Sequence, residues 1–244
     1  PSPIKYTLNH SKLKKVQNNK NIKCAVIIPD MQCGFRRDLL TGELTPIHDR
    51  EAIDVALQIS KYLNPDRIVF LGDNLDLAEM STKYLTTPDF YFTTQASLVE
   101  LSWWLAQFRL INENTKIDYI QGNHEKRLSK LINERVVSLY NIKCVNDLSG
   151  YSAMSIEKLL GLADLDIESH QYPQGKVALN SNLVCIHGDI AKGSSGATVS
   201  EVVKSARVSV IQGHIHRHEI ATKTTWDAFN NSHQYTAASF GCLC

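Results

Sequence analysis

The sequence lacks the features of a membrane, exported or fibrous protein. No apolar run in its 244 residues reaches the ~18 residues that a membrane-spanning helix needs. The N-terminal stretch PSPIKYTLNHSKLKK has no apolar signal-peptide core, so we expect a cytoplasmic protein with no membrane partner. With 43% hydrophobic and 21% charged residues, the composition is globular and excludes disorder, collagen and coiled coil.

No Pro-, Gly- or Ser-rich linker divides the chain, so we expect a single domain over residues 23–244. Residues 1–22 are expected to form a basic N-terminal arm, because lysines accumulate there and acidic residues are missing. We interpret the arm as solvated, with contact to a phosphate backbone as the alternative. The formal net charge of +1 gives no nucleic-acid signature for the whole chain.

The six cysteines show no zinc-finger spacing. Cys24 and Cys185 lie inside apolar runs and are expected in the core. Because no export signal precedes them, we expect reduced thiols rather than disulfides.

Short β-rich runs alternate with helical stretches, which is the order of an α/β protein. Buried strands are expected over 23–28, 67–71, 116–120, 183–187 and 208–212. Helices are expected over 49–63, 95–112, 125–140 and 198–206. The last segments, EIATKTTW and HQYTAASF, are expected to form antiparallel strands that close a sheet.

Each of the five expected buried strands ends in a polar cluster. The clusters are Pro29-Asp30-Met31-Gln32, Gly72-Asp73-Asn74, Gly122-Asn123-His124-Glu125, His187-Gly188-Asp189 and Gly213-His214-Ile215-His216. In open α/β sheets, ligands bind outside the carboxyl ends of the strands. Five successive strand ends would therefore bring carboxylate, amide and imidazole groups to one edge.

These side chains form a mixed oxygen and nitrogen ligand set without a thiolate. The set is Asp30, Asp73, Asn123, His187, His214 and His216. It suits Mn²⁺, Fe or Zn²⁺ better than a soft metal, and it is too large for one four-coordinate zinc. Two ions roughly 3.5–4 Å apart, bridged by one carboxylate, would use all of it and would clamp a phosphoryl group.

The five clusters resemble the motifs of the calcineurin-like metallophosphoesterase superfamily, in order and in spacing, from Cys24 to Arg217. Those motifs are D-x-H, G-D-x-x-D/N, G-N-H-E/D, H and G-H-x-H, and the second one also covers Asp76 here. The most similar subgroup is the small phosphoesterases of bacteriophages and bacteria, on the basis of Pro46-Ile47-His48-Asp49 and of Gly241 to Cys244. In that subgroup the chain continues further. The resemblance therefore implies a truncated sequence or a protein without that tail, and the host cytoplasm if a phage encodes it.

The resemblance implies a four-layer sandwich of two mixed β-sheets with helices outside. It also implies two divalent metal ions, with Mn²⁺ preferred and Fe, Zn²⁺ or Ni²⁺ as alternatives. Asp30, Asp73 and His216 would hold metal 1, and Asp73 would bridge the two ions. Asn123, His187 and His214 would hold metal 2. His124 would protonate the leaving oxygen.

One position departs from the family pattern, because Gln32 stands where the first motif usually has histidine. An amide oxygen is a weaker ligand than imidazole and prefers a harder metal. Three interpretations remain open: Gln32 binds metal 1 through its oxygen, His48 replaces it, or water fills the position.

The expected activity is hydrolysis of phosphate esters by a metal-activated hydroxide. A phosphodiesterase or nuclease is favoured by the basic arm, by the resemblance and by Lys126 and Arg127, which would grip substrate phosphate. Nucleotides and nucleic acids are therefore candidate substrates, although the two residues could equally form a plain basic helix face. The alternatives are a phosphomonoester phosphatase acting on protein or nucleotide, and a non-catalytic scaffold that keeps the fold.

Overall fold

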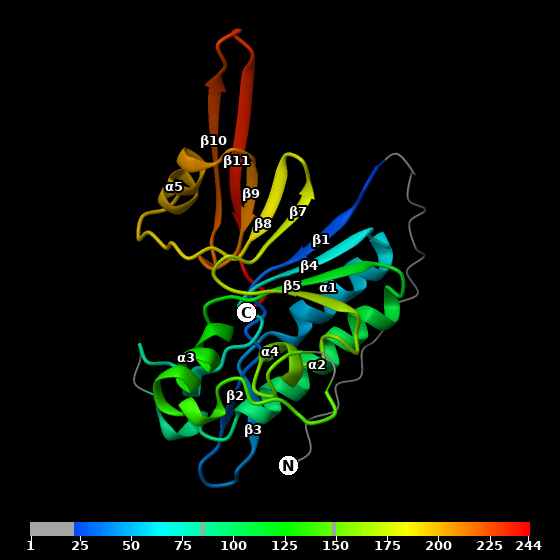
Figure 1. Ribbon diagram of the computed structural model, residues 1–244, viewed down its shortest axis with the longest axis vertical. Helices are drawn as coiled ribbons and strands as arrows, with labels where there is room; N and C mark the ends of the chain where they lie inside the picture. Colours follow the sequence, from blue (N-terminus) through cyan, green and yellow to red (C-terminus); the bar gives the residue numbers. More distant parts are fainter. Residues whose placement is uncertain (1–21, 84–85, 148–149) are drawn as a thin grey trace.

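The computed structural model describes residues 22–83, 86–147 and 150–244 (Figure 1). The arm expected over residues 1–22 therefore lies almost wholly outside the described residues. Lys23 follows it, and its ammonium group forms an ion pair with Asp66 at 2.9 Å.

The first sheet is parallel, with the strand order β1-β4-β5-β6. Its strands are β1 (Ala25–Ile28), β4 (Arg67–Leu71), β5 (Lys116–Ile120) and β6 (Ile167–His170). The first three confirm the strands predicted from apolar runs. Such runs are typical of strands that are covered on both faces. Strand β6 was not predicted. Its sequence IESH contains a single fully buried residue, Ile167.

Two long helices cover one face of this sheet, and both confirm the sequence prediction (Figure 1). Helix α1 (Arg50–Leu63) begins where the Asp49 side chain accepts a hydrogen bond from the Ala52 N–H at 2.9 Å. It ends at Asn64 in a left-handed conformation, before Pro65. Helix α2 is Thr94–Ile111. The largest core cluster, which includes Leu57, Phe70 and Trp104, fills the space between these helices and the sheet.

The helix predicted over 125–140 is shorter than expected. Helix α3 is Glu125–Arg135, and a separate 3₁₀ turn, η3 (Val137–Leu139), follows it. The β-branched pair Val136 and Val137 stands at the break, where branched side chains lower helix propensity. A further short helix, α4 (Ile156–Leu159), was not predicted.

The second sheet is mixed, with the order β10-β11-β9-β8-β7. Its strands are β7 (Lys176–Asn180), β8 (Leu183–Ile186), β9 (Ser209–Gln212), β10 (His218–Trp226) and β11 (Ser232–Phe240). Helix α5 (Ala197–Ser205) makes the crossover between the parallel strands β8 and β9. The predicted antiparallel pair is confirmed as β10 and β11, in register over their whole length. The expectation of two mixed sheets is wrong for the first sheet, where helical crossovers make every pair parallel.

The two sheets pack against each other through a second apolar cluster. Val69, Leu71 and Ile120 of the first sheet contact Val177 and Cys185 of the second. A third cluster joins α5 to the other face of the second sheet. Cys185 is therefore in the core as predicted, whereas Cys24 is only half-buried.

The remaining elements are small. Strands β2 (Phe35–Arg37) and β3 (Leu44–Pro46) form a separate hairpin, and two 3₁₀ turns, η1 (Ala78–Met80) and η2 (Pro88–Phe90), follow β4. Within the described residues, none of the helices combines the length and the apolar character that a bilayer crossing would require.

Candidate metal centre

The five polar clusters lie at the carboxyl ends of β1, β4, β5, β8 and β9. Backbone hydrogen bonds join the loops that carry them. The Asp30 N–H donates to the Gly72 carbonyl at 3.2 Å, and the Gly213 N–H donates to the His187 carbonyl at 3.1 Å. The parallel strand ends of both sheets therefore bring the clusters together, as the sequence pattern indicated.

One group of candidate ligands surrounds the Nε2 atom of His187. The Asp73 Oδ1 atom lies 3.3 Å from this nitrogen, and the Asn123 Oδ1 atom lies 3.2 Å from it. The imidazole of His214 stands edge-on to that of His187, with ring centroids 5.2 Å apart. Ligand atoms of Asp73, His187 and His214 all lie within 4.8 Å of one another. These are the residues expected around metal 2, with Asp73 as the bridge.

A second group surrounds the Nε2 atom of His216. The Asp30 Oδ1 atom lies 3.3 Å from it, and the Gln32 amide nitrogen also lies 3.3 Å from it. A half-turn of the Gln32 amide would bring its oxygen into that position. These are the residues expected around metal 1. The two groups are neighbours, because the charges of Asp30 and Asp73 act on both His187 and His216.

The backbone at the candidate ligands is strained. Five of them have positive φ angles: Asp30 (46°), Gln32 (44°), Asp73 (47°), His214 (72°) and His216 (52°). Residues other than glycine rarely adopt this left-handed region, and each instance costs on the order of 1–3 kcal/mol. Such strain persists where the surrounding structure holds a side chain in a particular direction, and it is common at functional sites.

Two glycines allow ligand side chains to lie directly on the backbone. Gly72 has φ +93°, and a Cβ atom there would collide with the imidazole of His187. At Gly122, a Cβ atom would collide with the carboxylate of Asp73. The glycines of these motifs are therefore required for close approach of the ligand side chains.

Both ring nitrogens of His187 face oxygen atoms. Its Nδ1 faces the Leu71 carbonyl at 2.9 Å, and its Nε2 faces the two oxygens of Asp73 and Asn123. Burial alone would lower the pKa of His187, but the hydrogen bond to Asp73 and the charges of Asp73 and Asp30 raise it. Burial would likewise raise the pKa of Asp73, but His187 and His124 hold it well below its usual range. The Nε2 atom of His187 thus faces the position that a cation would take between these ligands.

A second feature of the candidate metal centre is the imidazole of His214. Its Nδ1 atom is buried and has no hydrogen-bond partner among the residues that the structure describes. Burial and the charge of His187 lower the pKa of His214, which favours the neutral ring. A buried nitrogen without a partner is costly, and a metal ion would satisfy it. The group of Asp73, His187 and His214 therefore fits a divalent cation.

His124 lies beside this centre, between acidic and basic partners. Its Nε2 atom accepts a hydrogen bond from Arg127 Nη2 at 2.8 Å and lies 3.7 Å from Asp73 Oδ2. Its Nδ1 atom lies 3.3 Å from Asp76 Oδ1. Because an arginine can only donate, Nε2 is the acceptor in this bond. The Asp76 carboxylate lies on the Nδ1 side of the ring without a hydrogen bond to it.

The Glu125 carboxylate holds together loops that carry candidate ligands. Its carboxylate accepts hydrogen bonds from the backbone N–H groups of Gly122, Asp73, Asn74 and Leu75 and from the Tyr119 hydroxyl. It is fully buried, and burial together with the charge of Asp73 raises its pKa. Neither Asp76 nor Glu125 was expected to act in the centre, although both belong to the quoted motifs.

The two residues expected to bind substrate, Arg127 and Lys126, differ in their exposure and in their contacts. Arg127 is half-buried, and besides His124 it donates to the Asp76 carbonyl at 2.6 Å. Lys126 is exposed and lines a cleft of about 430 Å³ together with Gln121, Tyr140 and Tyr172. The cleft adjoins the centre, because Tyr172 lies against the imidazole of His187.

His48 is engaged away from the centre. Its Nδ1 atom lies 3.0 Å from the Gly34 carbonyl, and its Nε2 atom lies 3.0 Å from Glu100 Oε1. With both nitrogens engaged in a buried network, His48 is not available to replace Gln32. Of the three interpretations for metal 1, the oxygen of Gln32 and water remain.

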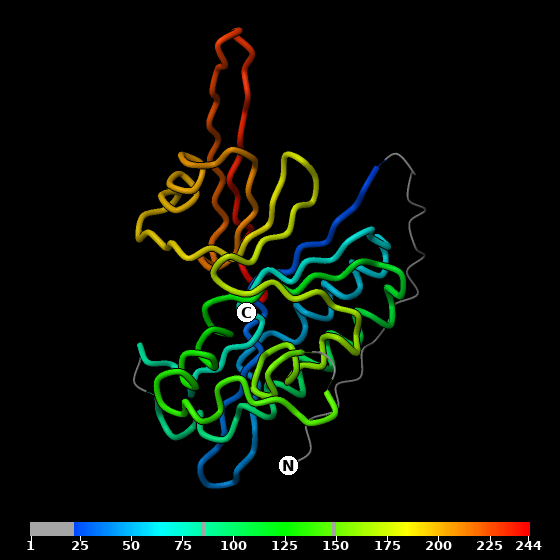
Figure 2. The backbone as a smooth tube through the Cα atoms, in the orientation of Figure 1, coloured from blue at the N-terminus to red at the C-terminus, as the bar shows by residue number. Residues whose placement is uncertain are grey.

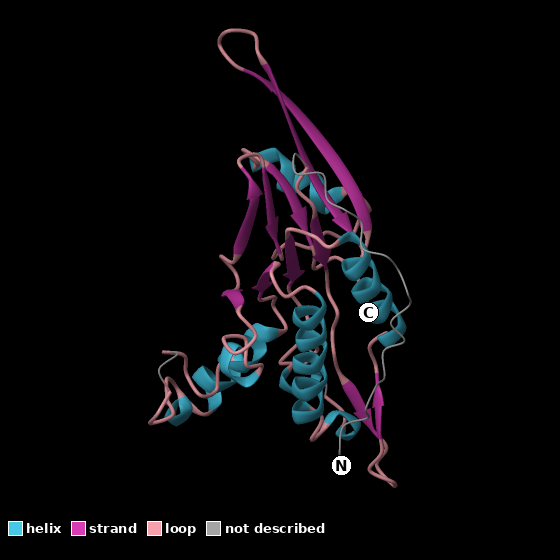
Figure 3. Ribbon diagram, turned by 90° about the vertical axis from the view of Figure 1, so that its right-hand side faces the viewer, coloured by secondary structure: helices cyan, strands magenta, loops and turns pink. Residues whose placement is uncertain are grey.

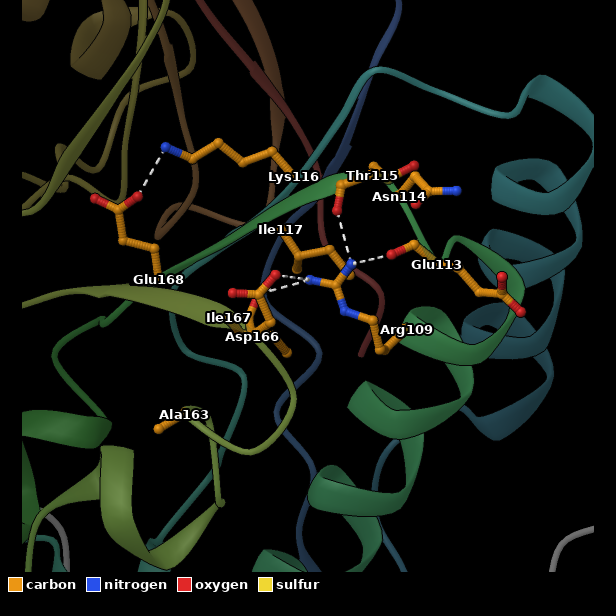
Figure 4. A pocket seen from close by; sticks show the side chains of 10 residues that line it. All are labelled: Arg109, Glu113, Asn114, Thr115, Lys116, Ile117, Ala163, Asp166, Ile167 and Glu168. Atoms are coloured by element: carbon orange, nitrogen blue, oxygen red, sulfur yellow. Dashed lines mark hydrogen bonds and ion pairs between the residues drawn. The ribbon is translucent and has the colours of Figure 1, made fainter. Parts of the chain in front are cut away.

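A different hollow, of about 570 Å³, lies at the amino ends of β5 and β6 (Figure 4). Arg109 lies at its centre, and the guanidinium donates to the carbonyls of Leu165, Thr115 and Asp166 at 2.8, 2.7 and 2.6 Å. These bonds tie the end of α2 to the following loops, which is a structural role. The hollow lies at the opposite strand ends from the candidate ligands.

Neither a scan against protein-family models nor a search of curated proteins finds a match to this chain. The geometry of the centre and the motifs themselves are therefore the observations that bear on function.

Proposed function

We propose that this chain is a phosphoesterase that works with two divalent cations, Mn²⁺ being preferred. The observation that carries the proposal is the His187–Asp73–Asn123 group, with the partnerless Nδ1 of His214 beside it. When bound, such cations supply an activated water and stabilise charge on the phosphoryl group.

The order of layers supports the proposal. Helices α1 and α2, the parallel sheet, the mixed sheet and helix α5 follow one another, with an apolar cluster at each junction. This arrangement is consistent with the four-layer sandwich of the calcineurin-like metallophosphoesterases, with the correction that only one sheet is mixed.

We assign proton transfer to His124 and phosphate binding to Arg127. A substrate phosphate would attract the Arg127 guanidinium, which now donates to His124 Nε2. Once Arg127 moves to the phosphate, Nε2 of His124 is free to take up a proton from solvent and to donate it to the leaving oxygen. Asp76 would hold the ring and stabilise its charge from the Nδ1 side.

A phosphodiester is the favoured substrate class. The cleft that contains Lys126, Tyr140 and Tyr172 offers room beside the centre for a group larger than a phosphate. A small phosphomonoester would leave this cleft without a role. A nucleotide or nucleic-acid diester would place a base or sugar there and a phosphate near Lys126.

The test uses protein stripped of metal by a chelator and reloaded with Mn²⁺. We expect metal-dependent hydrolysis of bis-nitrophenyl phosphate that exceeds hydrolysis of nitrophenyl phosphate. His214→Ala should abolish it, whereas the control His233→Ala, on strand β11 of the distal hairpin, should not. Faster monoester hydrolysis would favour a phosphatase. No hydrolysis of either ester with Mn²⁺, Fe²⁺, Zn²⁺ or Ni²⁺ would contradict the proposal and favour a scaffold.

A further inference from the structure

The segment Cys242-Leu243-Cys244 lies against the loop that carries Asp30 (Figure 2). The Leu243 N–H lies 3.3 Å from the carbonyl oxygens of both Pro29 and Asp30. The Leu243 side chain packs against the main core cluster. The segment is therefore anchored by its middle residue.

Both thiols, on either side of Leu243, gather beside the imidazole of His216. The Cys244 Sγ atom lies 3.7 Å from His216 Nδ1, and ligand atoms of all three residues lie within 4.8 Å of one another.

The spacing fits a tetrahedral ion. Zinc binds sulfur at about 2.3 Å and imidazole nitrogen at about 2.0–2.1 Å, which separates the two ligand atoms by about 3.6 Å in a tetrahedral site. The observed 3.7 Å between sulfur and nitrogen agrees with that geometry. His216 and Cys244 are exposed and Cys242 is half-buried, so an ion from solvent can reach the site.

We propose that Cys242, Cys244 and Nδ1 of His216 form a site for a thiophilic ion, Zn²⁺ in particular, separate from the centre of oxygen and nitrogen ligands. Two thiolates and one imidazole select a softer ion than that centre does. Each thiol releases its proton to solvent as it binds the ion. Three protein ligands leave a fourth position for water.

His216 would then belong to two sites. Its Nε2 faces Asp30 and Gln32, and its Nδ1 faces the thiols. A neutral imidazole has one nitrogen free to bind a cation, so occupation of the thiol site would weaken metal 1. This consequence for regulation rests on the proposed function, whereas the existence of the thiol site does not.

The experiment titrates Cd²⁺, a thiophilic stand-in for Zn²⁺, into reduced, metal-stripped protein and follows the ultraviolet sulfur-to-cadmium charge-transfer band. Cadmium at carboxylate and imidazole ligands gives no such band, so failure of the dimetal centre would not be mistaken for failure of this site. We expect the band to saturate at one Cd²⁺ per chain. It should be lost in the double variant Cys242→Ser/Cys244→Ser and kept in the control Cys144→Ser, which removes an exposed cysteine elsewhere.

A second measurement on the wild-type protein covers the case in which the double variant misfolds. Alkylation of each cysteine is followed by mass spectrometry with and without Zn²⁺. We expect Zn²⁺ to slow alkylation of Cys242 and Cys244 by about tenfold or more, because a bound thiolate is a poor nucleophile, while Cys144 stays reactive. Absence of the band, its survival in a folded double variant, or equal alkylation with and without Zn²⁺ would overturn the proposal.

Discussion

At the scale of single residues, Asp73 contacts several groups of the candidate metal centre. Its Oδ1 accepts the His124 N–H at 2.8 Å and lies 3.3 Å from His187 Nε2, while its Oδ2 faces the His124 ring. Its carboxylate is almost completely buried and directed at two histidines. The charge of this group, more than its hydrogen bonds, would attract cations.

Asp73→Asn should remove activity and lower the metal content, since a neutral amide keeps the size of the side chain but cannot bridge two dications well. Elemental analysis and the rate of ester hydrolysis measure the two effects. Asp54→Asn on helix α1 is the matched control and should leave both unchanged. A fully loaded, fully active Asp73→Asn protein would contradict the bridging role.

His124→Ala should keep the metals and the fold but slow the reaction, by an amount that depends on the leaving group. Nitrophenolate needs little protonation, so its release should slow modestly. An alkyl or ribose leaving group needs a proton, so its release should slow by about 10²-fold or more. Parallel kinetics with both esters, and elemental analysis, provide the measurement. Equal losses would mean that His124 holds phosphate instead, and loss of metal would make it a ligand.

Gln32→Ala should raise the Mn²⁺ concentration needed for half-maximal activity by about tenfold or more if the amide oxygen is a ligand. Gln32→His should lower that concentration and extend metal use towards Zn²⁺. Activity titrations with Mn²⁺ and Zn²⁺ check both variants. An unchanged Mn²⁺ requirement in Gln32→Ala would indicate that water completes metal 1, because His48 is held by Gly34 and Glu100.

At the scale of elements, a buried carboxylate holds α2 against the start of α1. Glu100 on α2 accepts two hydrogen bonds from Arg50, at 2.6 and 2.7 Å, and lies 3.0 Å from His48 Nε2. Burial alone would raise the pKa of Glu100, but the hydrogen bonds from His48 and Arg50 and their charges lower it to about 2. The ion pair between Arg50 and Glu100 therefore joins the two helices inside an apolar layer.

The lowered pKa of Glu100 predicts that the stability of the fold decreases as the pH becomes acidic. The pKa of Glu100 in the folded protein lies below its usual value of 4.5, so the unfolded chain takes up the proton first as the pH falls. The contribution of Glu100 is present at neutral pH and is lost between about pH 4.5 and pH 2. Glu100→Gln should thus lower Tm at pH 7, and the difference from wild type should narrow across that range. Thermal unfolding followed by circular dichroism measures it, and a constant difference would refute the linkage.

At the scale of the whole molecule, one arginine joins the two sheets. Arg67 on β4 donates to both carboxylate oxygens of Asp118, at 2.6 and 3.0 Å, and to the Ala178 carbonyl of β7 at 2.7 Å. The Asp118 side chain is fully buried. This bond lies at the opposite strand ends from the candidate ligands, so it concerns stability rather than chemistry.

Arg67→Met should destabilise the fold by about 3–5 kcal/mol, because it leaves the buried charge of Asp118 without its main partner. For a chain of this size, Tm should fall by about 10 °C. Lys116→Met is the control: Lys116 is about half exposed and pairs chiefly with the exposed Glu168, so its loss should change Tm little. Calorimetry measures the Tm of both variants. Equally small shifts in Tm would show that Asp118 finds other partners.

Much of this architecture was predictable, because apolar runs bounded by polar motifs mark strands β1, β4, β5, β8 and β9. Strands β6 and β7 were missed, since the short segments IESH and KVALN carry few apolar residues and their pairing depends on distant partners. The engagement of His48 by Glu100 and the folding of Leu243 onto Asp30 leave no local trace either. Contacts between residues far apart in sequence, rather than local patterns, decide these features.

The long hairpin of β10 and β11 extends beyond the rest of its sheet (Figures 1 and 3). Its turn is closed locally, because the Asp227 side chain accepts hydrogen bonds from the N–H groups of Phe229 and Asn231 at 2.8 and 2.9 Å. Such a tip tolerates inserted sequence well. A peptide tag placed between Phe229 and Asn230 would let the protein be immobilised in one orientation on a sensor surface. The candidate metal centre and the segment Cys242-Leu243-Cys244 lie away from this tip (Figure 1) and would remain accessible to the solution that flows past.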